Sequence, residues 1–343
     1  MLRKIRVLVV EDSLVFRELL VQNLNKDEGI EVVAAARDPF EARDMILKYQ
    51  PDVMTLDIEM PRMDGIEFLQ KLMPQYPMPV VMISSLSDRV FDAMNAGAVD
   101  FVAKPTSTDR RAIEEFIRTE LPVKIKIASI AKIHRRRTHA EVVNALHIQK
   151  PTGKCDLIAF GALTGGKEAT VDVLQVLHNN APEVVVVPHM PAGFTELYAS
   201  RLNEQCELEV REAKSGDIVR PGLVLLAPGG DQHMELIRQD NMYKIVLKKA
   251  PKVNGHCPSV DVLFSSVAKH AKENAMGVIL TGRGGDGAKG LLEMRKNGSH
   301  TIGQDETTCI VYGMPKVAYE IGAVEYQEKL PDIAKRIYNV LNK

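Results

Sequence analysis

Short runs rich in β-branched and aliphatic residues alternate with helical patterns along the first third of the chain. The runs lie at residues 5–10, 32–35, 53–56, 80–84 and 101–103. This alternation is typical of repeated βα units. Because crossovers between parallel strands are right-handed, such units build a doubly wound parallel sheet. Ligands of these sheets bind beyond the carboxyl ends of the strands, so functional side chains are expected there.

A second alternation of the same kind begins near residue 157. Its runs lie at residues 157–160, 184–187, 224–227 and 276–281. A chain of 343 residues exceeds what one core normally holds. The pattern therefore predicts two α/β domains, each with a doubly wound parallel sheet, at residues 1–122 and 153–343. A helical linker is expected between them, over residues 123–152.

The connecting segment contains a basic run, His134-Arg135-Arg136-Arg137. Such a run can contact nucleic acid, but one short cluster on a chain with a net charge of -1 is more often a solvated linker face. No helix-turn-helix pattern with a basic recognition face follows residue 150, so a DNA-reading effector is not expected. We therefore expect no nucleic-acid partner.

Cysteine usage and hydropathy bear on the location of the protein. The four cysteines stand at wide, irregular spacings without a Cys-x-x-Cys pair, as in reduced intracellular proteins. No apolar stretch approaches the ~20 residues that a membrane span needs. The expectation is a cytoplasmic protein without direct membrane insertion.

Polar residues stand at successive strand ends in the first half of the chain. They are Glu11, Asp12, Asp57, Ser84 and Lys104. Because the ends of parallel strands share one edge of the sheet, these side chains are expected to lie together. Clustered carboxylates repel one another unless a hard cation joins them, and Mg²⁺ binds a few carboxylates, waters and a phosphoryl oxygen. The alternative, that each acid caps a helix, explains single residues better than the whole set.

A glycine-rich turn, Gly161-Ala162-Leu163-Thr164-Gly165-Gly166, joins an apolar run to a helical pattern in the second half. Enzymes present nucleophiles on such turns, but Leu163 has no lone pair with which to attack. His189 follows the run at 184–187, and Asp286 lies in a second glycine-rich turn. A base and an orienting acid at these places would suit acyl transfer. Taken singly, His189 can also be a structural histidine and Asp286 a helix cap.

The polar set of the first half resembles the receiver domain of bacterial two-component response regulators, over about residues 5–120. The resemblance implies a flavodoxin-like fold in which Asp57 accepts a phosphoryl group from a histidine kinase. The implied Mg²⁺ ligands are Glu11, Asp12, Asp57 and the backbone carbonyl of Glu59. The implied phosphoryl-sensing residues are Ser84, Lys104 and Phe101. A cis peptide is implied before Pro105.

The second half resembles the catalytic domain of chemotaxis receptor methylesterases, the CheB family, over roughly residues 153–343. Besides the two glycine-rich turns, the matching stretches include Val187-Pro188-His189-Met190-Pro191-Ala192-Gly193-Phe194, Ala227-Pro228-Gly229-Gly230 and Pro258-Ser259-Val260-Asp261-Val262-Leu263-Phe264. The resemblance implies a Rossmann-like fold and hydrolysis of glutamate methyl esters, often with deamidation of glutamines, on the cytoplasmic helices of chemoreceptors. The kinase would then be a chemotaxis histidine kinase. No cofactor is implied for the esterase domain.

One departure from the family is central. The family's nucleophile is a serine in a Gly-Ala-Ser-Thr-Gly-Gly turn, and Leu163 stands in its place. By resemblance, His189 is the general base and Asp286 is its orienting acid, but no nucleophile carries over. Arg283 replaces a residue that is usually methionine, and Pro188 one that is commonly glutamine. Loss of one member of such a triad typically lowers kcat by several orders of magnitude.

Four explanations of a leucine at the nucleophile position remain open. Thr164 could attack as a weak substitute, although a displacement near 1 Å costs on the order of a hundredfold in rate. His189 could activate water directly. The leucine could be an engineered or allelic change in an otherwise active enzyme. The chain could instead be a catalytically impaired, phosphorylation-controlled protein that binds receptors without cleaving them.

Overall fold

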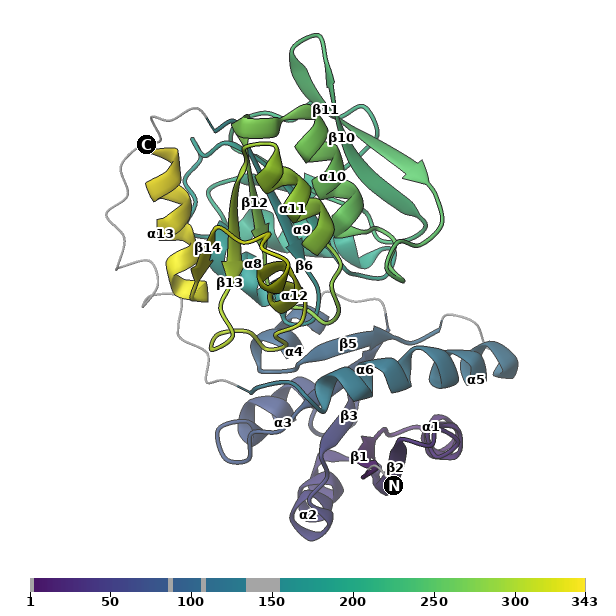
Figure 1. Ribbon diagram of the computed structural model, residues 1–343. Helices are drawn as coiled ribbons and strands as arrows, with labels where there is room; N and C mark the ends of the chain where they lie inside the picture. The colour runs from purple at the N-terminus through teal and green to yellow at the C-terminus, as the bar shows by residue number, and fades with distance from the viewer. Residues whose placement is uncertain (1–2, 86–88, 106–108, 134–154, 343) are drawn as a thin grey trace. The chain divides into compact units, whose positions relative to one another are not determined.

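The computed structural model describes residues 3–85, 89–105, 109–133 and 155–342. Contacts between residues divide the chain into two compact units, Met1–Ile133 and His134–Lys343. Figure 1 labels the helices and strands of both units. The basic run at residues 134–137 and most of the expected linker lie outside the described residues.

The first unit contains the predicted five-stranded parallel sheet. Its strands are β1 (Ile5–Val10), β2 (Ile30–Ala36), β3 (Val53–Asp57), β4 (Val80–Ser84) and β5 (Asp100–Ala103). Their order is β2-β1-β3-β4-β5, and every neighbouring pair is parallel. The chain winds in opposite directions from β1 and β3. The carboxyl ends of these two strands therefore form the crevice where ligands of such sheets bind.

The helices described in this unit are α1 (Leu14–Leu24), α2 (Pro39–Tyr49), α3 (Gly65–Leu72), α4 (Arg89–Asn95), α5 (Arg110–Thr119) and α6 (Leu121–Ala128). Carboxylates cap the start of three of them. Asp38 accepts hydrogen bonds from the first backbone N–H groups of α2, and Asp64 and Asp109 each accept one from the first turn of α3 and of α5. Such caps satisfy N–H groups that have no partner within the helix.

Helix α6 belongs to the first unit, although the sequence interpretation placed it at the start of the linker. It buries Leu121 and Ile125. Its Lys124 pairs with Asp100 of β5 at a distance of 2.6 Å. The first compact unit therefore extends to Ile133, beyond the boundary expected at residue 122.

The second unit contains a seven-stranded parallel sheet with the order β14-β13-β12-β6-β7-β9-β8. Four strands were predicted and are present: β6 (Leu157–Ala162), β7 (Glu183–Pro188), β9 (Leu223–Leu226) and β12 (Ala275–Ile279). Three more extend the sheet at its edges: β8 (Glu209–Glu212), β13 (His300–Gln304) and β14 (Tyr326–Glu328). From β6 the chain winds to β7 on one side and later to β12 on the other. The carboxyl ends of β6 and β12 thus form the ligand crevice of this sheet.

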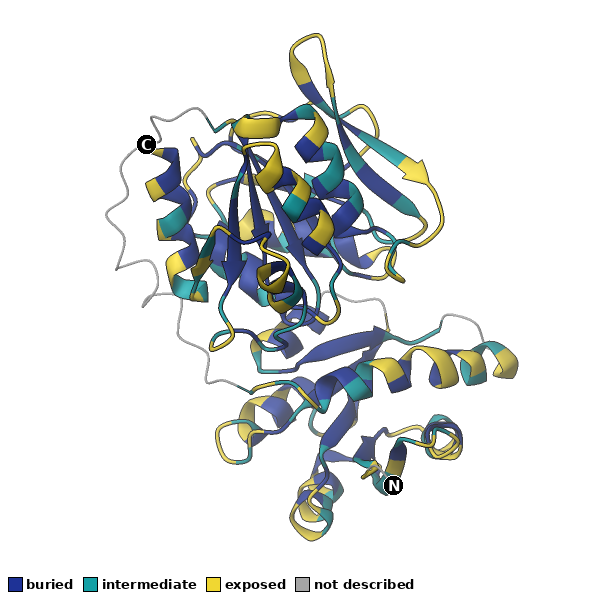
Figure 2. Ribbon diagram, in the orientation of Figure 1, coloured by how far each residue is buried: buried dark blue, intermediate teal, exposed yellow. Residues whose placement is uncertain are grey.

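A separate antiparallel hairpin, β10 (Gln232–Gln239) and β11 (Met242–Lys249), was not expected from the sequence. It lies against α10 (Val260–His270). The other helices are α8 (Gly166–Leu174), α9 (Phe194–Gln205), α11 (Ala288–Lys296), α12 (Met314–Glu320) and α13 (Leu330–Leu341), with a short 3₁₀ turn at Lys272–Asn274. Figure 2 shows buried strands in the sheet and helices that each expose one face to solvent.

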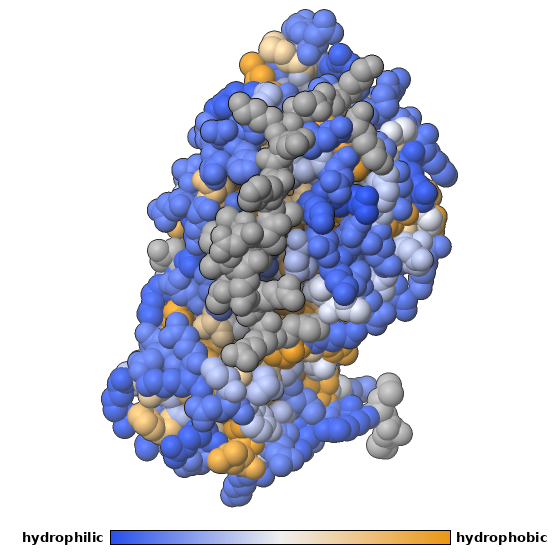
Figure 3. All heavy atoms as spheres, turned by 90° about the vertical axis from the view of Figure 1, so that its left-hand side faces the viewer, coloured by the Kyte–Doolittle hydropathy of each residue, from blue (hydrophilic) through white to orange (hydrophobic). Residues whose placement is uncertain are grey.

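The surface of the described residues carries scattered apolar side chains. The most exposed large ones are Val15, Leu47, Ile130 and Leu14. Figure 3 shows one face, on which hydrophilic residues dominate and hydrophobic residues form small separate spots. Within the described ranges, no helix combines the length and the apolar character needed to cross a membrane.

Candidate functional site

Three carboxylates meet at the carboxyl ends of β1 and β3 in the first unit. Oxygen atoms of Glu11, Asp12 and Asp57 lie within 4.8 Å of one another. Glu11 and Asp57 are buried, whereas Asp12 is exposed. Mg²⁺ prefers a few hard oxygen ligands and keeps several waters, so a carboxylate cluster that is open to solvent on one side fits this ion.

Lys104 places a positive charge against two of these carboxylates. Its Nζ lies 2.6 Å from Asp57 Oδ2 and 3.2 Å from Glu11 Oε2. Burial raises the pKa of Glu11 to about 7, and the Asp57 charge adds to this while Lys104 opposes it. Burial also raises the pKa of Asp57 against the attraction of Lys104. One ammonium group therefore does not balance the buried acids, which is the electrostatic condition that a bound cation would relieve.

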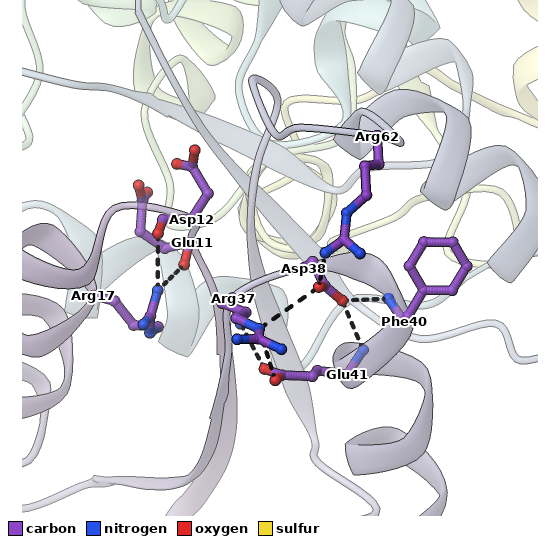
Figure 4. Close-up of polar contacts among 8 residues, drawn as sticks. All are labelled: Glu11, Asp12, Arg17, Arg37, Asp38, Phe40, Glu41 and Arg62. Atoms are coloured by element: carbon purple, nitrogen blue, oxygen red, sulfur yellow. Dashed lines mark hydrogen bonds and ion pairs between the residues drawn. The ribbon is translucent and has the colours of Figure 1, made fainter.

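Arg17 of α1 holds the backbone that carries the first two acids. Its Nη1 donates to the carbonyl oxygen of Glu11 at 2.6 Å and to that of Asp12 at 3.1 Å, as Figure 4 shows. The Ser13 N–H donates to Glu11 Oε1 at 3.2 Å. Sequence reasoning missed Arg17, because a side chain that binds backbone carbonyls leaves no recognisable motif.

A second contact ties the loop after β3 to the loop after β2. Arg62 pairs with Asp38, and its guanidinium lies 5.9 Å from the centroid of the Phe40 ring (Figure 4). The Arg62 backbone is left-handed, with a φ of 71°, which costs roughly 1–2 kcal/mol for a residue with a Cβ. The same loop carries Glu59, whose N–H donates to Asp57 Oδ1 at 3.3 Å. The loop is thus anchored outside the acid cluster. Sequence reasoning missed this pair as well.

The residues expected to sense a phosphoryl group lie at the ends of β4 and β5. Ser84 is buried, and its hydroxyl donates to the Ser85 carbonyl oxygen at 3.0 Å. Phe101 is buried within β5. Among the described residues the only cis peptide is Cys257–Pro258, so the bond before Pro105 is trans and that expectation is corrected. An X–Pro bond favours trans by only about 0.5–1 kcal/mol, and the local sequence does not decide its isomer.

The glycine-rich turn of the second unit joins β6 to α8, at the crevice of the sheet. The Leu163 N–H donates to the Thr281 carbonyl oxygen at 3.1 Å, and the Gly166 N–H donates to the Leu163 carbonyl oxygen at 2.9 Å. Gly165 has a left-handed backbone, with a φ of 74°. The Leu163 side chain is half-buried and packs against the hydrophobic core. A Cβ added at Gly282 would lie 2.7 Å from Leu163 Cβ, so the neighbouring turn must approach without a side chain.

Thr164 does not present its hydroxyl to solvent. The residue is 1% exposed, and within the described ranges its Oγ1 has no hydrogen-bond partner. Its carbonyl oxygen accepts a hydrogen bond from the Thr281 hydroxyl at 3.0 Å, which holds the backbone at this point. The geometry gives no support to attack by Thr164.

His189 and Asp286 come together although they are far apart in the sequence. His189 directly follows β7, Asp286 lies in the loop between β12 and α11, and His189 Nε2 is 3.3 Å from Asp286 Oδ2. The His189 side chain is 9% exposed and that of Asp286 is 1% exposed. A nearly buried imidazole held by a carboxylate is the arrangement of a general base with its orienting acid.

Five donors surround the Asp286 carboxylate. Besides His189, they are the Ser259 hydroxyl at 2.6 Å, Asn254 Nδ2 at 2.9 Å, and the N–H groups of Val260 at 2.7 Å and Asp261 at 3.3 Å. Burial alone would raise the pKa of Asp286, but the hydrogen bonds outweigh it and the pKa falls well below its ordinary value. The carboxylate also sits at the start of α10, where the helix dipole favours a negative charge. Asp286 is therefore ionised in the folded protein.

The turn before α10 contributes two residues that sequence reasoning missed. Asn254 reaches Asp286, and the His256 ring lies 4.1 Å from the His189 ring, centroid to centroid. The Asn254-Gly255 dipeptide is a turn signal that the sequence does show. Nothing in the sequence indicates that this turn faces residues 189 and 286, because that contact arises only from the packing of α10.

Comparisons with known proteins identify the families of the two units. A family model described as CheB methylesterase matches residues 158–337, and one described as response regulator receiver domain matches residues 7–117. A protein-glutamate methylesterase/protein-glutamine glutaminase 2 of Syntrophomonas wolfei is 56% identical over 100% of this chain and 99% of its own length. A protein-glutamate methylesterase/protein-glutamine glutaminase of Syntrophotalea carbinolica is 48% identical over 99% of both chains.

A solved structure supports the assignment of the second unit. The crystal structure of the Thermotoga maritima CheB methylesterase catalytic domain superposes with a TM-score of 0.53 and 36% sequence identity, covering 54% of this chain and 98% of that chain. The second α/β unit thus has a solved counterpart for its fold. With a receiver domain in front and relatives along its whole length, this chain belongs to the CheB methylesterase family of chemotaxis response regulators.

Proposed function

We propose that this chain is a phosphorylation-regulated chemotaxis protein whose second domain engages methyl-esterified glutamates of chemoreceptor helices but lacks the attacking oxygen of a working esterase. The full-length relatives are named as methylesterases and glutaminases, which supports the substrate class. Receptor glutamates and the corresponding glutamines would occupy the same crevice. Such a substrate requires a cytoplasmic location.

One observation carries the proposal: a base and acid pair stands next to Leu163, because Ala162 of β6 pairs with Pro188 of β7, directly before Leu163 and His189. His189 and Asp286 are in contact, and Asp286 is held by four further donors. The residue presented by the turn is Leu163, whose side chain can neither lose a proton nor form an ester bond. The pair therefore has no proton to remove from the turn.

A hydroxyl at position 163 would complete the chemistry. His189 would take its proton as the oxygen attacks the ester carbonyl, and would return the proton to the departing methanol. Asp286 would stabilise the imidazolium that forms between these two steps. The Arg283 backbone N–H is the expected donor to the oxyanion, and a backbone donor does not depend on the side chain at that position. Without the hydroxyl, kcat should fall by several orders of magnitude.

Release of methanol from a methylated receptor cytoplasmic fragment tests the proposal. The unmodified chain, Leu163→Ser and Leu163→Ala are compared after receiver phosphorylation. We expect Leu163→Ser to release methanol roughly a thousandfold faster, or more, than the other two proteins. Leu163→Ala is the matched control, since it removes the leucine bulk without adding a hydroxyl. If the unmodified chain releases methanol as fast as Leu163→Ser, the claim that Leu163 leaves the chain without a nucleophile is refuted.

The receiver half of the proposal concerns Asp57. We propose that it accepts a phosphoryl group from a chemotaxis histidine kinase, with Mg²⁺ held by Glu11, Asp12, Asp57 and the Glu59 carbonyl. The bound ion would supply charge neutralisation at the phosphoryl oxygens. The contacts of Lys104 with Asp57 and Glu11 support this role, because the same ammonium group can pair with a phosphoryl oxygen.

Labelling with acetyl phosphate in the presence of Mg²⁺ tests the role of Asp57. We expect incorporation into the unmodified chain and none into Asp57→Asn. Asp52→Asn is the matched control, because Asp52 lies near β3 and pairs with Arg3 at 2.9 Å, away from the acid cluster. Equal labelling of Asp57→Asn and the unmodified chain would exclude Asp57 as the acceptor.

A second candidate function is receptor binding without cleavage. The observation that favours it is the packing of Leu163 against the core, which makes the leucine part of the structure. If neither the unmodified chain nor Leu163→Ser releases methanol while both bind the methylated fragment, this function replaces the first.

A further inference from the structure

The turn between β11 and α10 contacts both members of the base and acid pair. Val253 and His256 exchange backbone hydrogen bonds at 3.0 and 2.9 Å, so only two residues, Asn254 and Gly255, form the turn itself. Both have left-handed backbones, with φ values of 52° and 83°. An Asn-Gly pair is the usual choice for such a two-residue turn.

The Asn254 side chain bridges two buried carboxylates. Its Nδ2 donates to Asp286 Oδ1 at 2.9 Å and to Asp261 Oδ2 at 2.7 Å. Both hydrogens of the amide are therefore used. Asp286 is 1% exposed and Asp261 is 8% exposed, so their charges are poorly screened by solvent. A neutral double donor between two carboxylates stabilises both negative charges without adding a third.

The environment of the pair makes this bridge necessary. Burial raises the pKa of Asp261, and the Asp286 charge raises it further, while the Gly290 N–H and Asn254 oppose both effects. Lys289 adds a weaker opposing charge. Asp261 would repel the Asp286 carboxylate if nothing stood between them. His256, on the other end of the same turn, lies against the His189 ring.

We infer that Asn254 is a positioning residue for the His189–Asp286 pair: its amide joins Asp286 to Asp261 and so keeps the Asp286 carboxylate directed at His189. This inference rests on the proposed function only in naming what the pair is for. The geometric claim applies to the unmodified chain with Leu163. The positioning role of Asn254 differs from a role in forming the turn, because asparagine, aspartate and glycine can all form such a turn.

Two substitutions separate these roles. Asn254→Asp keeps the shape and tolerates the left-handed backbone, but it replaces the donor with a third carboxylate. Asn254→Gly keeps the backbone conformation and removes the side chain. Asn241→Asp and Asn241→Gly are the matched controls, because Asn241 is an exposed asparagine in the β10–β11 turn with a left-handed φ of 60°.

The first measurement does not depend on turnover. The imidazole N–H resonance of His189 is recorded by NMR on the ¹⁵N-labelled full-length chain and assigned with His189→Gln. We expect this low-field signal in the unmodified chain and in both Asn241 variants, and its loss or upfield displacement in both Asn254 variants. Unchanged resonances in Asn254→Asp and Asn254→Gly would overturn the inference.

The second measurement uses the Leu163→Ser background and the methylated receptor fragment. Removal of one hydrogen bond to a charged group should lower kcat about tenfold in Asn254→Gly, and by at least as much in Asn254→Asp, with KM unchanged. Equal losses in kcat and in receptor binding would instead indicate a general loss of structure and contradict a positioning role. If Leu163→Ser itself is inactive, the proposed function fails, and the His189 resonance still decides the role of Asn254.

Discussion

Two buried threonines, Thr164 in the glycine-rich turn and Thr281 next to it, differ in their hydrogen bonds, so their replacement by valine should have opposite effects on stability. Thr164 and Thr281 are each 1% exposed. The Thr281 hydroxyl lies 3.0 Å from the Thr164 carbonyl oxygen and 3.2 Å from that of Val311, either of which can accept its one hydrogen, and it accepts from the Val311 N–H at 3.0 Å. The Thr164 hydroxyl has no partner within the described ranges. Valine has nearly the same shape as threonine and lacks the hydroxyl.

The magnitudes follow from these contacts. A buried hydroxyl without a partner costs about 1–3 kcal/mol relative to water, so Thr164→Val should stabilise the second unit by about 1 kcal/mol. Thr281→Val leaves a buried N–H and a carbonyl without their partner and should destabilise by about 1–3 kcal/mol. For a domain of this size, 1 kcal/mol corresponds to roughly 2–4 °C in Tm.

Hydrogen exchange of peptides from β6 and β12, measured against urea concentration, reports on the second unit alone. A denaturation midpoint of Thr164→Val at or below that of Thr281→Val would show that the Thr164 hydroxyl is satisfied and would refute the reasoning. Thr164→Val also tests whether Thr164 acts as a weak substitute for the missing nucleophile. Any residual methanol release by the unmodified chain should survive in Thr164→Val, because the hydroxyl is buried.

Two further predictions concern charged groups. Burial and the neighbouring Asp156 raise the pKa of Glu183 from 4.5 to about 7, so folding favours the protonated acid, and stability should fall as the pH rises from about 4.5 to 7. At pH 8, Glu183→Gln should therefore have a free energy of unfolding about 1–2 kcal/mol higher than the unmodified chain, after allowance for solvent screening. At pH 4.5 the two proteins should be equally stable. Urea titrations at both pH values measure this. In the first unit, Arg62→Gly removes the pair with Asp38 but relieves the left-handed backbone, so it should be more stable than Arg62→Ala by about 1 kcal/mol. Equal midpoints for the two Arg62 variants would show that the backbone is not strained.

The strands that could be predicted are those whose sequences consist mostly of apolar residues. All five strands of the first sheet and four of the second have this composition. Strand β13 escaped because it buries Thr301 and Gln304, whose polar groups are satisfied by hydrogen bonds to distant residues. The β10–β11 hairpin did carry a sequence signal that the prediction missed: Asp240-Asn241 separates two runs in which apolar residues stand at alternate positions.

Some residues of the candidate sites could likewise be predicted from local sequence patterns, and others could not. His189 and Asp286 were identified because each directly follows a strand or lies in a glycine-rich turn, and the structure brings them together. Asn254 is 32 residues from Asp286 in the sequence, and Arg62 is 24 residues from Asp38. These pairs depend on how separate helices and loops pack, and no local pattern encodes that. The sequence also gives no local signal that α6 packs on the first unit, because the burial of Leu121 and Ile125 depends on tertiary contacts.

The position of Asp286 at the start of α10 bears on how proteins of this kind are classified. Its carboxylate accepts from Ser259, Val260 and Asp261 and thereby begins that helix, whether or not an ester is ever cleaved. A chain that has lost its chemistry would still be stabilised by this residue, because the carboxylate caps α10. An intact acid in a sequence survey is therefore no evidence of activity by itself, and the residue at position 163 must be examined as well.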